Sequence, residues 1–336
     1  MVVSHSFAIA GNPQPAVGAM DLGTIGVVVF FGVSGFLITQ SWITDPDLWR
    51  FAAKRALRIL PALIVVLLVT TLVIGPLVSS LSPSAYLAQA GTWAYLIQNT
   101  AMITTGELPG VFTDLPYPRQ VNAVLWTLQA EVIAYICVAI VGLVGLLRTK
   151  WFVPLATVVL VVAPHGLVPW TRELFMLQAF AVGASLYLMR EHVPWHAGLA
   201  AIGLLAWSIA PEGLQLLLAV GVIPYATIFV AYRGPTILRR LTARGDYSYG
   251  IYLLGWPIGQ VVALLFGSSV TTAIVLGVSA PITYLLAMAS WTYIEKPALG
   301  LKKHLRGRHN EPRVVGGLDL AARRHQAETR AEVGSG

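Results

Sequence analysis

The feature that most constrains the fold of this chain is the apolar run from Thr24 to Ile43. Twenty residues in a helix span ~30 Å, which is the thickness of the hydrocarbon core of a bilayer. Comparable runs recur near residues 57–79, 123–147, 151–168, 172–190, 197–211, 213–232, 247–266 and 270–293. The first ten residues are also apolar, but as a helix they would span only ~15 Å. We therefore predict an all-α fold, a polytopic transmembrane helix bundle of about ten helices with the first one truncated.

Composition supports a membrane protein. Of the 336 residues, 56% are hydrophobic and only 11% are charged, whereas a soluble domain carries ~25% charged residues. The single cysteine, Cys137, lies in an apolar run, so the sequence encodes no disulfide framework. Polar residues interrupt the segment 84–104, which we interpret as an interfacial or re-entrant piece rather than a further span.

The distribution of basic residues predicts the topology. If the loop at 44–56 is cytoplasmic, alternation of the predicted spans places twenty of the twenty-two Lys and Arg residues on the cytoplasmic side. The net charge of +7 is then a topology signal and does not indicate nucleic-acid binding. We predict a multi-pass protein of the cell membrane, in contact with membrane lipid, with both termini cytoplasmic. Residues 1–298 would form the transmembrane domain, and residues 299–336 a basic, disordered cytoplasmic tail.

Three polar residues within the apolar runs are candidates for function. Glu131 lies in the run 123–147, where an ionisable residue is costly and a partner is expected. Ser34 lies between Gly32 and Gly35 and offers a hydroxyl where water is scarce, although small residues also serve ordinary helix packing. His5 is the only histidine in an apolar run of the amino-terminal half, and histidine is the usual base for removing a hydroxyl proton. For His5 the alternative is a structural role. For Glu131 it is a carboxyl that only holds helices together through hydrogen bonds.

Five sequence elements, in this order, resemble the acyltransferase-3 family of integral membrane enzymes that acylate sugars. They are the first-helix His5, FFGVSGFLIT followed by RALRILP, WTLQAE ending at Glu131, GDYSYGIYL around Tyr249, and the late element ending in Glu295-Lys296-Pro297. Together they extend over roughly residues 5–298. The chain departs from the family in two places. The Arg expected eleven residues before His5 would precede Met1, and Gly255 stands where many members have a His.

The resemblance implies an O-acyltransferase that uses cytoplasmic acyl-CoA, commonly acetyl-CoA, as donor substrate, with no tightly bound cofactor and no metal. The acceptor would be a hydroxyl of a cell-envelope glycan, a lipid-linked sugar or a glycosylated metabolite. His5 would be the base, and Glu131 would orient groups or relay protons. Arg55 and Arg58 are expected to bind donor phosphates, since guanidinium groups suit phosphate recognition. We place Ser34, Tyr249 and Glu295 in the same donor site.

Two other functions remain open from the sequence. Buried polar residues also line transport pathways, so a transporter or flippase of sugars or lipids is one alternative. The other is a catalytically inactive homologue, because the half-length first helix and the absent Arg would leave His5 poorly positioned. A start codon upstream of Met1 would supply both missing features.

Overall fold

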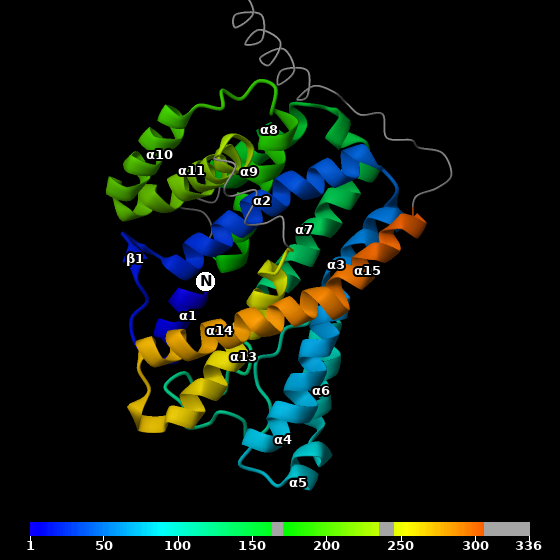
Figure 1. Ribbon diagram of the computed structural model, residues 1–336. Coiled ribbons are helices and arrows are strands. Elements are labelled where there is room, and N and C mark those ends of the chain that lie inside the picture. The colour runs from blue at the N-terminus through cyan, green and yellow to red at the C-terminus, as the bar shows by residue number, and fades with distance from the viewer. Residues whose placement is uncertain (163–170, 235–244, 306–336) are drawn as a thin grey trace, which may run out of the picture. The chain divides into compact units, whose positions relative to one another are not determined.

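The computed structural model describes residues 1–162, 171–234 and 245–305. Within these ranges the secondary structure is almost entirely helical (Figure 1). The helices are α1 (Val2–Ile9), α2 (Leu22–Thr44), α3 (Leu48–Val69), α4 (Gly75–Val78), α5 (Pro83–Ala88), α6 (Ala90–Thr100), α7 (Trp126–Leu143), α8 (Phe152–Val162), α9 (Arg172–Leu188), α10 (Ala197–Ile209), α11 (Glu212–Arg233), α13 (Ser248–Phe266), α14 (Thr272–Ser290) and α15 (Lys296–Gly300). The two described strands, β1 (Ala16–Val17) and β2 (Met20–Asp21), form one short antiparallel hairpin between α1 and α2.

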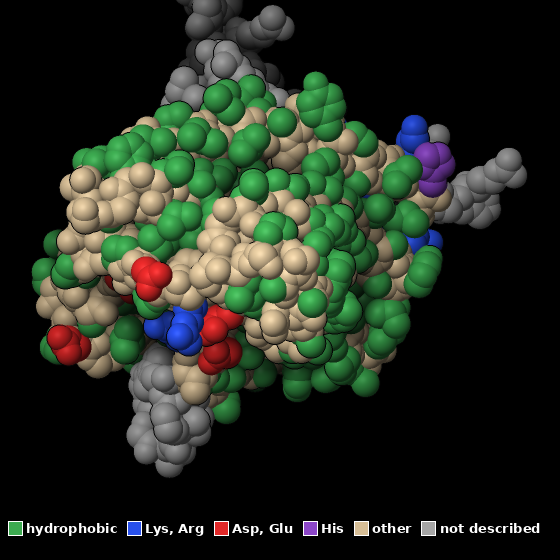
Figure 2. Space-filling model, turned by 90° about the horizontal axis from the view of Figure 1, so that it is seen from below, with side chains coloured by type: hydrophobic (Ala, Val, Ile, Leu, Met, Phe, Trp, Pro, Cys, Tyr) green, Lys and Arg blue, Asp and Glu red, His purple; other side chains and the backbone are tan. Residues whose placement is uncertain are grey.

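The membrane character predicted from the sequence is confirmed. Six described helical segments are long and apolar enough to cross a membrane, namely Leu22–Thr44, Leu48–Val78, Trp126–Leu143, Glu212–Arg233, Ser248–Ser269 and Thr272–Leu305. Three other predicted spans correspond to the shorter helices α8, α9 and α10, and part of the span predicted at 151–168 lies outside the described residues. Figure 2 shows a face of the molecule dominated by hydrophobic side chains. Large apolar residues such as Leu77 and Leu265 are exposed, as expected where a surface meets lipid.

The chain divides into two compact units, Met1–Gly300 and Leu301–Gly336. The first contains all the helices named above. Of the second, only the 3-10 turn Leu301–Leu305 is described. The basic tail predicted at 299–336 therefore lies largely outside the described residues.

Glycines set the closest helix contact of the first unit. A Cβ on Gly35 of α2 would lie 1.9 Å from the carbonyl oxygen of Phe180 in α9, and a Cβ on Gly183 of α9 would lie 1.9 Å from the carbonyl oxygen of Gly32. Only glycine permits backbones to approach this closely. The packing interpretation is therefore correct for Gly32 and Gly35, and Ser34 between them faces a different neighbour. Figure 1 shows α2 between the α9–α11 helices and α7.

Among the described helices, two carry a π-helical segment. The helix that begins as α3 continues through a π segment, Thr70–Ile74, into α4, and α14 continues through a second, Trp291–Glu295, into α15. The second segment packs against α3, and α15 lies beside α3 in Figure 1. Inserted π turns shift the direction of side chains and are frequent at functional sites. Here the segment brings Glu295 to α3.

The beginning of α3 differs from the prediction. The loop expected at 44–56 is wrong, because the helix begins at Leu48. Asp47 is its N-cap and accepts a hydrogen bond from the backbone nitrogen of Arg50 at 2.7 Å. A side-chain acceptor at this position satisfies an otherwise unpaired backbone donor. Lys54 and Arg55 therefore lie on a helix, and the connection from α2 is only three residues long.

Candidate active site

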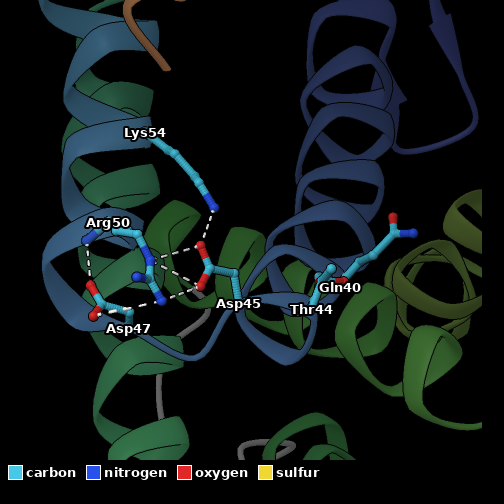
Figure 3. Close-up of polar contacts among 6 residues, drawn as sticks. All are labelled: Gln40, Thr44, Asp45, Asp47, Arg50 and Lys54. Atoms are coloured by element: carbon cyan, nitrogen blue, oxygen red, sulfur yellow. Dashed lines mark hydrogen bonds and ion pairs between the residues drawn. The ribbon is translucent and has the colours of Figure 1, made fainter. Parts of the chain in front are cut away.

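Two of the four basic residues in the first three turns of α3 are held by acidic residues of the α2–α3 connection (Figure 3). The Asp45 carboxylate accepts hydrogen bonds from Arg50 Nη2 at 2.6 Å and from Lys54 Nζ at 2.7 Å. Partial burial raises the pKa of Asp45, but these hydrogen bonds and the two positive charges outweigh it and hold the pKa below its ordinary value. Arg50 and Lys54 are thus engaged within the protein. Arg55 and Arg58, the two arginines predicted to bind the donor, lie further along α3.

Arg58 lies in a group of charged and aromatic side chains from α3, α13 and the end of α14. Its Nη2 atom is 2.6 Å from Asp246 Oδ2, and its Nη1 atom is 3.6 Å from Glu295 Oε2. The guanidinium also lies over the ring of Tyr249, 5.5 Å from its centroid. The Tyr249 hydroxyl donates to the carbonyl of Ile59 at 2.9 Å, which fixes α13 to α3. The structure thus brings the predicted Arg58, Tyr249 and Glu295 together.

Glu295 is almost completely buried, with 2% of its surface exposed. Its Oε1 atom accepts a hydrogen bond from Ser290 Oγ at 2.9 Å, while Oε2 has no hydrogen-bond partner and lies only within ion-pair distance of Arg58. A buried carboxylate depends strongly on the charge beside it. Arg58 therefore stabilises the end of α14 as well as offering a positive charge.

Glu131 lies in a second, more apolar group. It is the sixth residue of α7 and is 6% exposed. The Tyr135 hydroxyl, one turn later on the same face, donates a hydrogen bond to Glu131 Oε1. Ser34 Oγ of α2 reaches the same oxygen at 3.5 Å. Tyr135 was not among the predicted site residues, although its spacing of four from Glu131 places both side chains on one helix face.

Arg55 joins this second group through aromatic contacts. Its guanidinium carbon lies 5.9 Å from the ring centroids of both Phe51 and Tyr135. It forms no ion pair within the described residues, and its buried Nε atom has no hydrogen-bond partner. Glu131 interacts with it electrostatically. We refer to Ser34, Arg55, Glu131 and Tyr135 as the Glu131 group.

His5 lies apart from both groups. Its ring meets the edge of the Trp256 ring of α13, with centroids 5.1 Å apart. Trp256 Nε1 donates to the carbonyl of Gln120 at 3.0 Å, and Tyr117 packs against Trp256 with centroids 4.9 Å apart. Within the described residues, no hydrogen bond reaches the His5 imidazole. Its nitrogens are therefore not occupied by protein groups.

One face of α13 contacts Arg58, the start of α7 and His5. Tyr249, Tyr252 and Trp256 recur at spacings of three and four residues and so share that face. Tyr249 contacts Arg58, Trp256 contacts His5, and the Tyr252 hydroxyl between them hydrogen-bonds Thr127 Oγ1 near the start of α7. Seven residues of helix correspond to ~10 Å along its axis. The candidate groups are therefore spread along α13, with the Arg58 guanidinium at its beginning and the His5 imidazole near its middle.

The described part of the chain holds no cluster of acidic, histidine and cysteine side chains that suggests a metal site. In the residues that the structure describes, no group of three or more of them could hold a metal ion. The candidate site offers an imidazole, two buried carboxyl groups and two guanidinium groups.

Comparison with known proteins identifies the family of the chain. The model of the family described as "Acyltransferase domain" matches residues 1–292. The chain therefore belongs to this acyltransferase family, and the resemblance seen in the sequence elements is confirmed. It is an O-acyltransferase of the membrane-embedded, multi-pass type.

Two curated relatives cover most of the chain. An "O-acetyl transferase" of Shigella phage Sf6 is 26% identical over 88% of this chain and 91% of its own length. "Nodulation protein 10" of Rhizobium leguminosarum bv. viciae is 28% identical over 88% of each chain. No solved structure matches the chain.

Proposed function

We propose that this enzyme transfers an acyl group from an acyl-CoA thioester to a hydroxyl of a cell-envelope glycan, a lipid-linked sugar or a glycosylated metabolite. The observation that carries the proposal is the separation of the groups along α13, with the Arg58 guanidinium at its beginning and, about two turns further, a His5 imidazole that takes no hydrogen bond within the described residues. A CoA thioester has its phosphates at one end and its reactive carbonyl at the other, so it requires such a separation. The name of the phage relative, an O-acetyl transferase, supports acetyl as the acyl group.

Each residue has a role in the proposed reaction. Arg55 and Arg58 bind the donor phosphates, with Ser34, Tyr249 and Glu295 shaping the donor site around them. The acceptor hydroxyl oxygen attacks the thioester carbonyl carbon, so that a C–O bond forms and the C–S bond breaks. His5 takes the hydroxyl proton and returns it to the departing CoA thiolate. Glu131, fixed by Tyr135, orients these groups or relays the proton.

The proposed topology has the amino terminus and the tail on the cytoplasmic side. Its support is the excess of Lys and Arg in the loops predicted to be cytoplasmic. Arg55 and Arg58 then lie within reach of cytoplasmic acyl-CoA.

The test is transfer of labelled acetyl groups in reconstituted vesicles. The purified protein is incubated with radiolabelled acetyl-CoA and an extract of envelope glycans, and alkali-labile label in the glycan is measured. We expect transfer by the unaltered chain and by His192→Ala, an exposed histidine of a turn that serves as control, and none by His5→Ala. Movement of sugar across the vesicle membrane without label in the product would instead identify a transporter.

A further inference from the structure

The connection between α6 and α7 contains a short closed loop, residues 112–119. The backbone nitrogen of Arg119 donates a hydrogen bond to the carbonyl of Phe112 at 2.8 Å, which joins the two ends of the loop. Both residues have positive φ angles, 55° at Phe112 and 61° at Arg119, a conformation that residues with a Cβ seldom adopt. Strained backbone of this kind is concentrated at active sites and ligand contacts. The loop is therefore a candidate for a functional role.

Side chains of α13 fix this loop through its backbone. Gln260, which is fully buried, donates hydrogen bonds from Nε2 to the carbonyls of Tyr117 and Gln120, both at 2.8 Å. Trp256, one turn earlier on the same helix, also donates to the Gln120 carbonyl. Because these hydrogen bonds go to the backbone, they fix the position of the loop without engaging the side chains that it presents.

The loop lies beside the end of the helix that carries His5. A Cβ on Gly11, which follows α1, would lie 3.0 Å from the Cβ of Pro116. The Trp256 ring contacts both His5 and Tyr117, with centroid distances of 5.1 and 4.9 Å, so the ring centroids of Tyr117 and His5 are at most about 10 Å apart. Trp256 is buried, whereas Tyr117 is 37% exposed. Tyr117 thus offers a partly exposed aromatic ring close to the proposed base.

The exposed side chains of the loop suit a carbohydrate. A sugar ring has an apolar face of C–H groups, which packs against an aromatic ring, and hydroxyls at its edge, which need hydrogen-bond partners. Tyr117 provides the aromatic ring. Asp114 and Arg119, both exposed on the same loop, provide a hydrogen-bond acceptor and several donors.

The position of the loop along α13 favours the acceptor over the donor. Tyr249, which contacts Arg58, lies at the beginning of the helix, and Trp256, which contacts His5, lies further along. Gln260, which holds the loop, lies one turn beyond Trp256. With the donor's phosphates at Arg58 and its thioester at His5, the acceptor hydroxyl has to arrive from the side of His5 that is away from Arg58. The residues that hold the loop lie on that side.

We infer that residues 112–119 form an acceptor subsite, in which the ring of Tyr117 stacks on the C–H face of a sugar of the acceptor glycan. The inference rests on the proposed function, because it requires the acceptor hydroxyl to reach His5. The short distance between the two rings allows a sugar at Tyr117 to be the same unit as the reacting sugar or its neighbour in the glycan. Tyr117 therefore contributes to the affinity for the acceptor and has no part in binding the donor.

The experiment measures radiolabelled acetyl transfer by the full chain in vesicles at increasing concentrations of the envelope-glycan extract, expressed as total hexose. Loss of one stacked ring corresponds to about a tenfold change in affinity. We expect Tyr117→Ala to raise the KM for the extract about tenfold, with kcat within about twofold of the unaltered protein and the KM for acetyl-CoA unchanged. Tyr117→Phe keeps the ring and should keep both KM values.

Two further variants complete the series. If Tyr117→Ala is poorly folded, Tyr117→Leu keeps an apolar contact with Trp256 but has no flat ring, and it should raise the KM for the extract in the same way. The matched control is Tyr284→Ala, which removes a 47% exposed ring from α14 and should leave the KM for the extract unchanged.

The two kinetic constants separate an acceptor subsite from a structural role. A fall in kcat with an unchanged KM for the extract would overturn the inference, because Tyr117 would then only support Trp256 and His5. Unchanged kinetics, or a rise in the KM for acetyl-CoA alone, would also overturn it and leave acetyl transfer intact. Binding of acetyl-CoA without transfer to glycan by the unaltered chain would overturn the proposed function and this inference with it.

Discussion

Arg55 and Arg58 lie one turn apart on α3, but their surroundings are opposite in kind. Arg58 is paired with Asp246 and Glu295, so its charge is balanced by two carboxylates. Arg55 lies against the rings of Phe51 and Tyr135, and its Nε atom has no partner. An aromatic face attracts a cation without satisfying its hydrogen-bond donors. Arg55 is consequently the better prepared of the two to bind an incoming anion.

This difference indicates that Arg58 contributes mainly to stability and Arg55 mainly to ligand binding, although both belong to the RALRILP element. Asp246 lies two residues before α13, and Glu295 lies in the π segment that follows α14, so this arginine joins α3 to both of these parts of the chain. The aromatic contacts of Arg55 belong to α3 and α7 alone. We expect substitutions at Arg58 to act first on folding, and substitutions in the Glu131 group to act first on activity.

The largest expected effect is the loss of acyl transfer on substitution within the Glu131 group. Glu131→Gln keeps the shape of the side chain but removes its charge and its ability to carry a proton. We expect acyl transfer to fall by ~10²- to 10⁴-fold, as is usual when a general acid–base group is lost, with the protein still folded. The assay is the initial rate of labelled acetyl transfer, with Glu191→Gln in an exposed turn as control. A rate near that of the unaltered protein would show that Glu131 only holds helices together.

The second-largest expected effect is on stability, and it tests the difference between Arg58 and Arg55 directly. Arg58→Met leaves the buried Glu295 without its ion pair, which should cost ~3 kcal/mol of the free energy of unfolding or more. In Arg55→Met the buried carboxylate of Glu131 keeps a close partner, so the free energy of unfolding should fall by only about 1 kcal/mol or less. Denaturant unfolding of both variants in one detergent measures the difference. Equal losses would contradict the separate roles, and Arg58→Met combined with Glu295→Gln should recover part of the loss.

A third and smaller effect concerns donor affinity. Lysine cannot reproduce the planar fork of a guanidinium group on a phosphate. We expect Arg55→Lys to weaken binding of acetyl-CoA by about tenfold, or ~1.4 kcal/mol. Arg58→Lys should weaken it less, because its carboxylate partners compete with the donor. Equilibrium binding of labelled acetyl-CoA distinguishes the two variants, and a larger loss at Arg58 would reverse the assignment.

The smallest expected effect concerns the ion pairs at the beginning of α3. Asp45→Asn should lower stability by less than about 1 kcal/mol, since its partners Arg50 and Lys54 are partly exposed. The pKa of Asp45 is lowered in the folded protein, so its contribution is present above the unfolded pKa of ~3.9 and is lost as pH falls through the folded value. The difference in melting temperature between the unaltered protein and Asp45→Asn should therefore be constant near neutral pH and shrink below about pH 4. A difference that grows with acidity would contradict the ion-pair account.

The sequence alone determined the class of fold and the positions of most helices. A run of apolar residues long enough to cross a bilayer is a local property, and no distant contact is needed to recognise it. The same holds for Glu131 and Ser34, because a polar side chain in such a run is conspicuous. The start of α3 was missed, because the charged residues Arg50, Lys54 and Arg55 suggested a loop, whereas they lie on a helix with Asp47 as its N-cap.

Tertiary structure alone decided which side chains meet. Nothing in the order of residues places Ser34 of α2 beside Glu131, which is 97 positions later, or Arg58 beside Glu295. It also decided that Gly35 lies against α9 and Gly32 against Pro224 of α11, while Ser34 between them turns to the Glu131 group. Helix formation depends on neighbours along the chain, whereas the partner of a buried polar group depends on how whole helices pack. Two arginines of one motif can therefore differ in role for reasons that lie on other helices.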